Sequence, residues 1–447
     1  MYSFIARSLF FNVFVICFFS AQAQSLNDAL QAAWANDPAL QSAAANRIVA
    51  KENVYIAKSR LLPQVSIQGS QSSLSQTTTQ TTTLGPQSNS FKGDSYNYTF
   101  QVRQGVIRPR DWVGLTLGKQ QAYYGELKFQ SAKSDLWNRT SSAWIDLIAA
   151  QMVRMAYDVA IKTISESAKQ ESMRFEKGDG TKDAYIEAQA QLVQAKALLK
   201  DAELNVKSKI KAFQLITGMA PRDWMDRHLP LTHLTVFESL GRDTLWERVL
   251  ELTPELMALR VVENINKIKI DQSFYDQLPT VDLYGQASRA QNDTTNTLGY
   301  HYQNQQVGVQ LSMPLYSGGG LQASKRQNVA SYEASVADRE SLQMRIETQF
   351  TSDWAGQEGL IERAYAAKSL VLSAEEQKKA TLLGLQKGMK TWSDVSNVEL
   401  LLARRATDLI SIQQNIFKLQ ARILSLLPVD EPAWESWIQQ FDVVSIK

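Results

Sequence analysis

The stretch Leu62-Pro63-Gln64-Val65 returns 216 residues later as Leu278-Pro279-Thr280-Val281, and this repetition decides the fold. Farther along the chain, Trp144 matches Trp354 at an offset of 210. Self-similarity at a nearly fixed offset indicates a tandem duplication. Because the offset falls by six residues, from 216 to 210, the first half is expected to carry a longer insertion between Val65 and Trp144.

Apolar and polar residues alternate with period two after each Leu-Pro pair. The apolar members are Val65, Ile67, Gly69, Tyr96, Tyr98, Phe100 and Val102 in the first half, and Val281, Leu283, Gly285, Val307, Val309, Leu311 and Met313 in the second. Such alternation predicts four strands, each with one apolar and one polar face. The polar stretches 75–90 and 290–299 between them have the composition of solvated loops.

Long helical segments follow the strands. Residues 126–177 contain no Gly or Pro, and as one helix these 52 residues would extend ~78 Å. Beyond them, apolar residues recur at spacings of three and four, at Tyr185, Ala188, Leu192, Ala195, Leu199, Ala202, Val206, Ile210 and Phe213. Adding 210 to each position gives seven apolar residues of nine. This spacing is typical of a coiled coil, and its seam is duplicated with the rest of the chain.

Composition excludes several classes of protein. The 447 residues include 47 Lys and Arg against 45 Asp and Glu, and a net charge of +2 argues against a nucleic-acid binder. Hydrophobic residues at 44% indicate a folded chain. Past the N-terminus, no segment approaches the ~20 apolar residues of a membrane-spanning helix, which excludes a helical membrane protein.

The N-terminus reads as a signal peptide, residues 1–23. Arg7 precedes an apolar stretch from Leu9 to Phe19, and Ala21-Gln22-Ala23 gives the small-x-small cleavage pattern. An uncleaved anchor is the alternative, but the apolar run is short for one. The only cysteine, Cys17, leaves with this segment, so disulfides, thiol catalysis and thiolate metal sites are not expected.

No signature of an enzyme, a cofactor or a metal site stands out. The three histidines are His228, His233 and His301, and the first two lie near prolines without acidic partners at metal-ligand spacing. We therefore expect neither catalysis nor a bound metal.

Four amphipathic strands from an exported chain suit an outer-membrane barrel, with a small periplasmic sheet packed on a helix as the alternative. Four strands cannot close a barrel, and hydrocarbon does not tolerate an open sheet edge, so several chains must share one barrel. Two chains would give eight strands and a filled interior, whereas three would give twelve and a lumen. Aromatic residues at the strand ends would then form interfacial belts, unless they pack in a core. They are Tyr96, Tyr98, Trp112, Tyr300, Tyr302 and Tyr316.

Two further motifs accompany the Leu-Pro strand starts: Leu311-Ser312-Met313-Pro314-Leu315-Tyr316-Ser317-Gly318-Gly319 and Phe213-Gln214-Leu215-Ile216-Thr217-Gly218. With these motifs, the chain resembles the TolC family of outer-membrane channel-tunnels from Leu26 to about Leu427. This resemblance implies a mainly α, α+β fold in a homotrimer, with a twelve-stranded outer-membrane barrel continued by an α-helical barrel across the periplasm. It also implies outer-membrane lipid around the strands, and a periplasmic adaptor that connects the tunnel to an inner-membrane ABC or proton-driven transporter.

On this resemblance the chain divides into two repeats and a tail. The first repeat, 24–243, holds strands at about 64–76 and 94–107, a helical hairpin at 111–218 and an equatorial segment at 219–243. The second, 244–427, holds strands at about 280–290 and 303–314 and a hairpin at 319–427, and residues 428–447 form an equatorial tail.

The helical hairpins turn at glycines, Gly178 and Gly180 in the first and Gly388 in the second. Glycine accepts φ > 0 without steric cost, so helix punctuation alone explains these residues. The resemblance implies that the turns also form the periplasmic tip that contacts the adaptor.

Just past the second turn, Asp394 and Asn397 share one helical face. The family has two aspartates there, which ring the periplasmic aperture, so this ring would be half as acidic. The resemblance also implies an entrance latch, for which Lys390 and Asp183 are the candidate pair. Leu385 stands where the family has a latching tyrosine.

The expected function is a passive outer-membrane duct for type I protein secretion. The alternative within the same class is a duct for small-molecule efflux. A periplasmic coiled-coil adaptor or scaffold is the alternative from a different class, because it would share the seams but have no lipid-facing strands.

Overall fold

A computed structural model describes residues 25–220, 229, 241–293 and 299–442. The predicted signal peptide, and most of the segment 219–243 with His228 and His233, lie outside the described residues.

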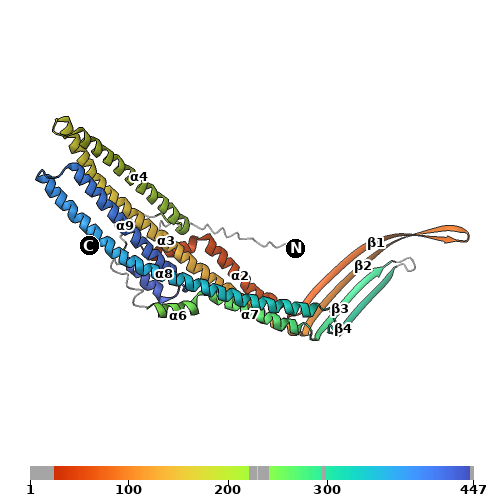
Figure 1. The fold of residues 1–447 in the computed structure, drawn as a ribbon. Helices are drawn as coiled ribbons and strands as arrows, with labels where there is room; N and C mark the ends of the chain where they lie inside the picture. Colours follow the sequence, from red (N-terminus) through yellow and green to blue (C-terminus); the bar gives the residue numbers. More distant parts are fainter. Residues whose placement is uncertain (1–24, 221–228, 230–240, 294–298, 443–447) are drawn as a thin grey trace, which may run out of the picture.

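The same order of elements occurs twice along the chain (Figure 1). The first set is α1 (Leu26–Asn36), α2 (Pro38–Ser59), β1 (Gln64–Thr82), β2 (Gly85–Ile107), α3 (Pro109–Glu176) and α4 (Lys182–Thr217). The second is α6 (Arg242–Leu252), α7 (Pro254–Tyr275), β3 (Thr280–Asn292), β4 (Tyr300–Ser312), α8 (Gly320–Gln386) and α9 (Trp392–Leu424), and α10 (Pro432–Asp442) follows. The predicted duplication and the mainly helical class are confirmed.

The four strands form one antiparallel sheet in the order β1-β2-β3-β4. Its register aligns apolar residues across all four strands, in a row formed by Val65, Val102, Gly285 and Val307. The neighbouring row, on the other face, is polar and is formed by Ser66, Gln101, Gln286 and Gln306. The apolar face is uncovered, since the side chain of Val307 is 82% exposed. The alternative interpretation required a sheet packed on a helix of its own chain. The exposed apolar face contradicts it.

The hairpin of β1 and β2 is longer than predicted. Residues 75–90 were expected to form a loop, but β1 continues to Thr82 and β2 starts at Gly85. Its outer part, which we call the distal ribbon (Ser73–Thr82 paired with Gly85–Asp94), extends past the last pairing of β2 with β3 at Ser95. Threonine is a good strand former, and a ribbon with water on both faces shows no apolar alternation. The prediction failed for that reason, although it placed the insertion correctly.

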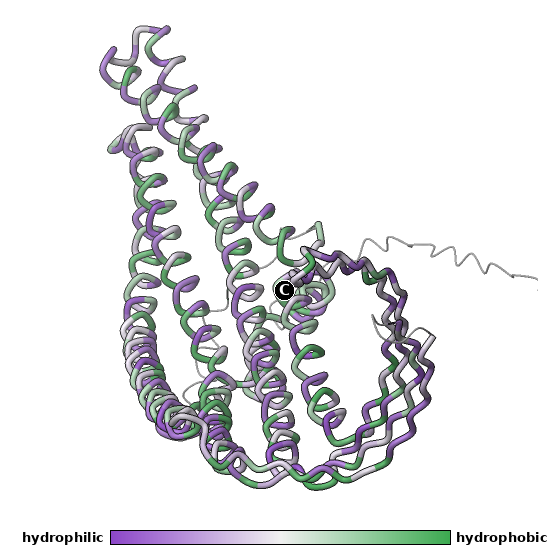
Figure 2. Tube along the Cα trace, turned by 90° about the vertical axis from the view of Figure 1, so that its right-hand side faces the viewer, coloured by the Kyte–Doolittle hydropathy of each residue, from purple (hydrophilic) through white to green (hydrophobic). Residues whose placement is uncertain are grey.

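Helices and strands form one curved wall, which Figure 2 shows from the side. The longest helices are α3 and α8, with 68 and 67 residues, or about 100 Å each. Next to the sheet, the neighbours run α2, α3, α7, α8. Toward the far end they run α4, α3, α9, α8. At every level, then, one edge of the wall belongs to the first repeat and the other to the second.

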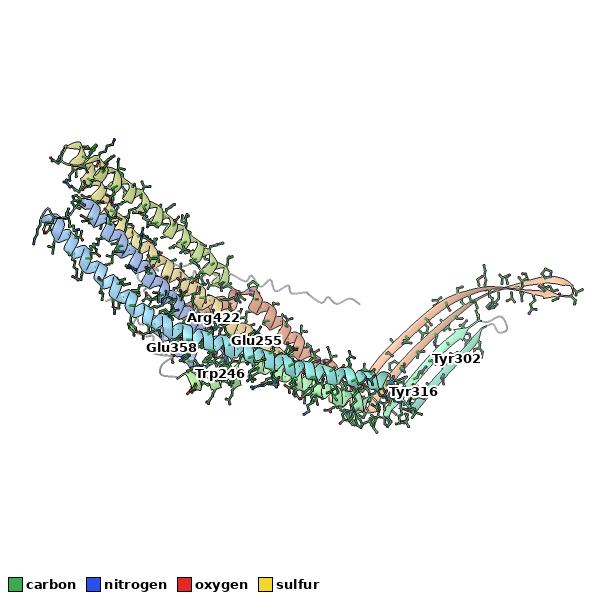
Figure 3. All side chains as sticks on the ribbon, viewed as in Figure 1. Trp246, Glu255, Tyr302, Tyr316, Glu358 and Arg422 are labelled. Atoms are coloured by element: carbon green, nitrogen blue, oxygen red, sulfur yellow. The ribbon has the colours of Figure 1, made fainter. Side chains whose placement is uncertain are left out.

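The main core lies midway along the long helices, where α1, α6 and α10 pack against them. Trp434 and Trp437 of α10 are fully buried, and Trp437 donates from Nε1 to Gln420 Oε1 at 3.0 Å. Figure 3 marks this region with Trp246 and Arg422. The hydrogen bond explains why the second seam has a glutamine at this position. All nine positions of the first seam are buried or half-buried, as the spacing predicts.

Within the described part of the chain, no helix combines the length and the apolarity needed to cross a membrane.

Candidate functional site

The two hairpin turns lie together at the end of the wall farthest from the sheet (Figure 1). Gly178 has φ of 79° and Gly388 has φ of 72°, so both adopt the left-handed conformation that favours glycine. A Cβ at either position would meet nothing within 4 Å. Backbone conformation therefore requires these two glycines, and their surroundings leave the turn surface open.

Gly180 is required for a different reason. A Cβ there would lie 2.9 Å from the backbone nitrogen of Phe175. Its amide donates to Arg174 O at 3.0 Å, which closes the turn. The next residue, Thr181, caps α4 by accepting from the amide of Ala184.

Asp394 is first of all a helix cap. Its Oδ2 accepts from the Thr391 amide at 2.9 Å, and Thr391 Oγ1 accepts from the Asp394 amide at 3.1 Å, which completes a capping box at the start of α9. The hydrogen bonds from Thr391 and the charge of Lys390 outweigh burial and lower the pKa of Asp394 below its ordinary value. Asp394 is thus a negative charge held at the tip.

Lys390 pairs with Asp394 and not with Asp183. Lys390 Nζ lies 3.8 Å from Asp394 Oδ1, on a half-exposed pair of side chains. Among the described residues, no ion pair joins Lys390 to Asp183, which stays exposed in the first turn of α4. The latch expected between these two residues is therefore not made within one chain.

A buried glutamine joins the two hairpins instead. Gln191 of α4 is 7% exposed, and its Nε2 donates to Asn397 Oδ1 at 3.0 Å and Ser393 Oγ at 3.2 Å on α9. It also lies 3.0 Å from Glu187 Oε1 on its own helix. Asn397, expected at the aperture, is thus tied to the first hairpin. Sequence reasoning missed Gln191, although a polar residue three positions after Ala188 in the seam was a usable signal.

A groove of about 560 Å³ lies at the tip beside the second turn, facing the end of α3. Arg174 of α3 forms one side, and Leu382, Leu385, Lys390 and Trp392 of the second hairpin form the other. The groove combines two cations with apolar side chains. Leu385, which stands where the resemblance to the family places a tyrosine, lines this groove.

Charged residues fix the junction at the opposite end, where strands become helices. Asp282 of β3 is 4% exposed and pairs with Arg103 of β2 and with Arg108, the residue before α3. Arg108 Nε lies 2.7 Å from Asp282 Oδ1 and its Nη1 lies 3.4 Å from Asp111 Oδ2. This cluster joins the two repeats on the polar face of the sheet.

An amphipathic sheet with two open edges, continued by helices of about 100 Å, is typical of a membrane protein whose strands lie in the bilayer and whose helices extend beyond it. The family model described as "Outer membrane efflux protein" matches residues 29–219 and 245–427. The chain belongs to this outer membrane efflux protein family.

Individual relatives agree with this assignment. The chain is 25% identical over 406 residues to the alkaline protease secretion protein AprF of Pseudomonas aeruginosa, covering 90% of this chain and 84% of the relative. It is 24% identical over 378 residues to the outer membrane protein TolC of Vibrio cholerae, covering 83% of each. The fold matches the crystal structure of the Campylobacter jejuni CmeC outer membrane channel with a TM-score of 0.72, at 13% identity, over 94% of this chain and 90% of that one.

Family membership settles several expectations. The resemblance to TolC is confirmed, and the chain is an outer-membrane channel protein that extends into the periplasm. The family consists of channels and not of enzymes, as the sequence predicted. The interpretation as a periplasmic adaptor or scaffold is wrong, because the family match covers the strands as well as the helices.

Proposed function

We propose that three copies of this chain close into a tunnel through which type I secretion exports proteins. The observation that carries this proposal is the open wall. Its edges are β1, α2 and α4 on one side and β4 and α8 on the other, so head-to-tail contact between copies pairs unlike edges. A heterologous contact of this kind generates a ring when its rotation closes, and the curvature of the wall favours closure.

Exposed apolar side chains on the edge helices support the ring. They are Ile48, Val49, Tyr55 and Ile56 on α2, Ile186, Val193 and Leu204 on α4, and Met344, Leu370, Leu372 and Leu383 on α8. Apolar area of this extent on long helices favours contact with a further chain. Three copies give twelve strands, the first count that leaves a lumen.

The strands have the length and polarity of a membrane wall. β3 and β4 have 13 residues each, more than the ~9–11 that a tilted strand needs to cross a bilayer. The aromatic residues at strand ends are largely exposed: Tyr98, Trp112, Tyr300 and Tyr316 are 52–87% exposed. Figure 3 places Tyr302 on the sheet and Tyr316 at its base. Tyr96 and Tyr98 share the apolar face with Val102 and suit an interfacial belt, whereas Tyr300 and Tyr302 lie on the polar face with Gln306.

The tip is proposed as the contact for a periplasmic adaptor, through the turns at Gly178, Gly180 and Gly388 and the groove beside the second turn. An inner-membrane ABC transporter is the proposed source of cargo, with a proton-driven transporter as the variant for efflux. Asp394 and Asn397 are proposed to border the aperture. Within each chain, Gln191 is proposed to hold the two hairpins together as the latch. Between chains, a contact of Lys390 with Asp183 of a neighbouring copy remains a proposal.

Protein secretion is favoured over small-molecule efflux by the relative named for protease secretion. The test is to delete the gene in the source bacterium and to compare proteins in the culture supernatant with growth under toxic small molecules. We expect secreted proteins to disappear while sensitivity to drugs and detergents is unchanged. Normal secretion with a fall in resistance would support the efflux alternative and contradict the proposal.

A further inference from the structure

The junction between strands and helices carries an apolar groove that the export function does not use. It is lined by Pro109, Trp112, Val113 and Thr116 of α3 and by Tyr275 and Leu278 at the end of α7. Its volume is about 500 Å³, and Trp112 is 52% exposed beside it.

The groove opens on the apolar side of the wall. Asp111 lies on the polar side, because it pairs with Arg108, which pairs with Asp282 on the polar face of the sheet. With 3.6 residues per turn, the four lining residues of α3 centre roughly 150° around the helix from Asp111. They therefore face the same side as Ile107 and Leu283, which belong to the apolar face.

In the proposed ring, neighbouring copies would not cover this groove. It lies between α3 and α7, which are the inner members of the layer α2, α3, α7, α8. Contacts between copies use the outer members, α2 and α8. A closed ring therefore leaves the groove open to its surroundings.

We propose that this groove binds one acyl chain of a phospholipid from the periplasm-facing leaflet. The proposal rests on the proposed function, which places the apolar face of the strands in lipid. The groove continues that face directly, and Trp and Tyr are the side chains enriched where a bilayer meets water. A free apolar ligand from the periplasm is a less suitable occupant, because the groove begins where the lipid-facing strands end.

The groove recognises the acyl chain and not the head group. The charges next to the groove along the chain are paired: Arg110 Nη1 lies 3.1 Å from Asp276 Oδ1, and Arg108 pairs with Asp111 on the polar side. No net charge is left there to select an anionic lipid. Zwitterionic and anionic phospholipids with the same acyl chains should therefore bind alike.

Trp112 reports on the groove directly. The next tryptophan along α3, Trp137, lies 25 residues farther from the sheet, or ~38 Å. Purified trimer in detergent is titrated with dibrominated phosphatidylcholine, whose bromines quench tryptophan fluorescence on contact. The part of the emission that disappears in Trp112→Phe is assigned to Trp112.

We expect this part of the emission to be quenched in a saturable way, stoichiometrically with the chain. Val113→Phe fills the groove and should abolish the saturable quenching. The matched control Ile107→Phe, on the strand outside the groove, should retain it. Dibrominated phosphatidylglycerol should quench to the same extent.

Quenching that rises without saturation and is the same in Val113→Phe would overturn the proposal, since it describes ordinary bilayer contact. Quenching by only one of the two head groups would also contradict it. Channel conductance is measured in the same preparations. Conducting trimers without saturable quenching would reject the lipid site alone, whereas trimers that never conduct would reject the proposed function.

Discussion

Gln191 connects the two hairpins of one chain near the tip through side-chain hydrogen bonds. Two hydrogens on its Nε2 face three acceptors at 3.0–3.2 Å, on Glu187, Ser393 and Asn397. Its Oε1 is buried without a partner among the described residues. Because its hydrogen-bonding groups are only partly satisfied, Gln191 contributes little to the stability of the fold. Its contact with the second hairpin can therefore break when the entrance opens.

Replacing Gln191 with alanine should therefore loosen the entrance without unfolding the protein. The lost hydrogen bonds are worth roughly 1–2 kcal/mol per chain. Single-channel recordings should show larger or longer openings for Gln191→Ala. The control is Gln194→Ala, an exposed glutamine on the same helix, which should behave as wild type. Identical recordings for both variants would remove Gln191 from the latch.

Asp146 of α3 holds three helices together. Its carboxylate accepts from Lys209 of α4, and from Lys418 and Gln414 of α9, at 2.7–2.9 Å. Burial alone would raise the pKa of Asp146, but the hydrogen bonds from the two lysines outweigh it and lower the pKa below its ordinary value.

The lowered pKa of Asp146 determines how the free energy of unfolding depends on pH. A carboxyl group with a lowered pKa stabilises the fold above its unfolded pKa of about 3.9, and this stability is lost as the pH falls through the lower folded value. Asp146→Asn should cost about 2 kcal/mol at pH 7. Its deficit in unfolding free energy relative to wild type should shrink below about pH 4. Asp158→Asn, in an exposed pair with Lys162, should cost far less at either pH.

At the scale of elements, two substitutions in the second turn distinguish a conformational role of Gly388 from a role in binding the adaptor. Gly388→Ala should cost roughly 1–2 kcal/mol, because alanine avoids the left-handed conformation. Gly388→Asn should restore most of that stability, since asparagine tolerates it better. If the turn surface also contacts the adaptor, Gly388→Asn should fold normally and still bind the adaptor more weakly in co-purification. Full binding by Gly388→Asn would leave the glycine with a structural role only.

The distal ribbon is an element that we expect the assembly not to need. Its strands pair with each other over about 33 Å and have no other strand beside them. Replacing residues 76–91 with a two-residue turn should leave the oligomer and its conductance unchanged. Loss of the oligomer, measured by native electrophoresis, would show that the ribbon takes part in assembly.

Much of this architecture was predictable from sequence, because the duplication repeats each signal. The strand starts after the two Leu-Pro pairs, the seam from Tyr185 to Phe213 and the turn glycines are all local patterns. The distal ribbon was missed because it is polar on both faces. The contact of Gln191 with Asn397 was missed because it joins residues 206 positions apart, on helices whose relative rotation no local pattern specifies.

At the scale of the whole molecule, one chain is an incomplete wall. The sheet ends in unpaired β1 and β4, and the helical layer ends in α2, α4 and α8. Unpaired strand edges cannot face hydrocarbon, which is the physical reason for proposing that copies of the chain share one barrel. In the proposed ring, the junction cluster at Asp282 would repeat in every copy, where the barrel meets the helices.

Cross-linking between β1 and β4 tests this ring most directly. Gln68→Cys on β1 is combined in turn with Asn304→Cys, Gln306→Cys or Gln310→Cys on β4, all on the polar face. The only native cysteine, Cys17, lies in the predicted signal peptide, and Thr99→Cys on the inner strand β2 is the control. We predict that at least one pair gives a non-reducing ladder ending at three chains, with no cross-links between chains from Thr99→Cys. A ladder that ends at two chains or continues past three would contradict the closed trimer.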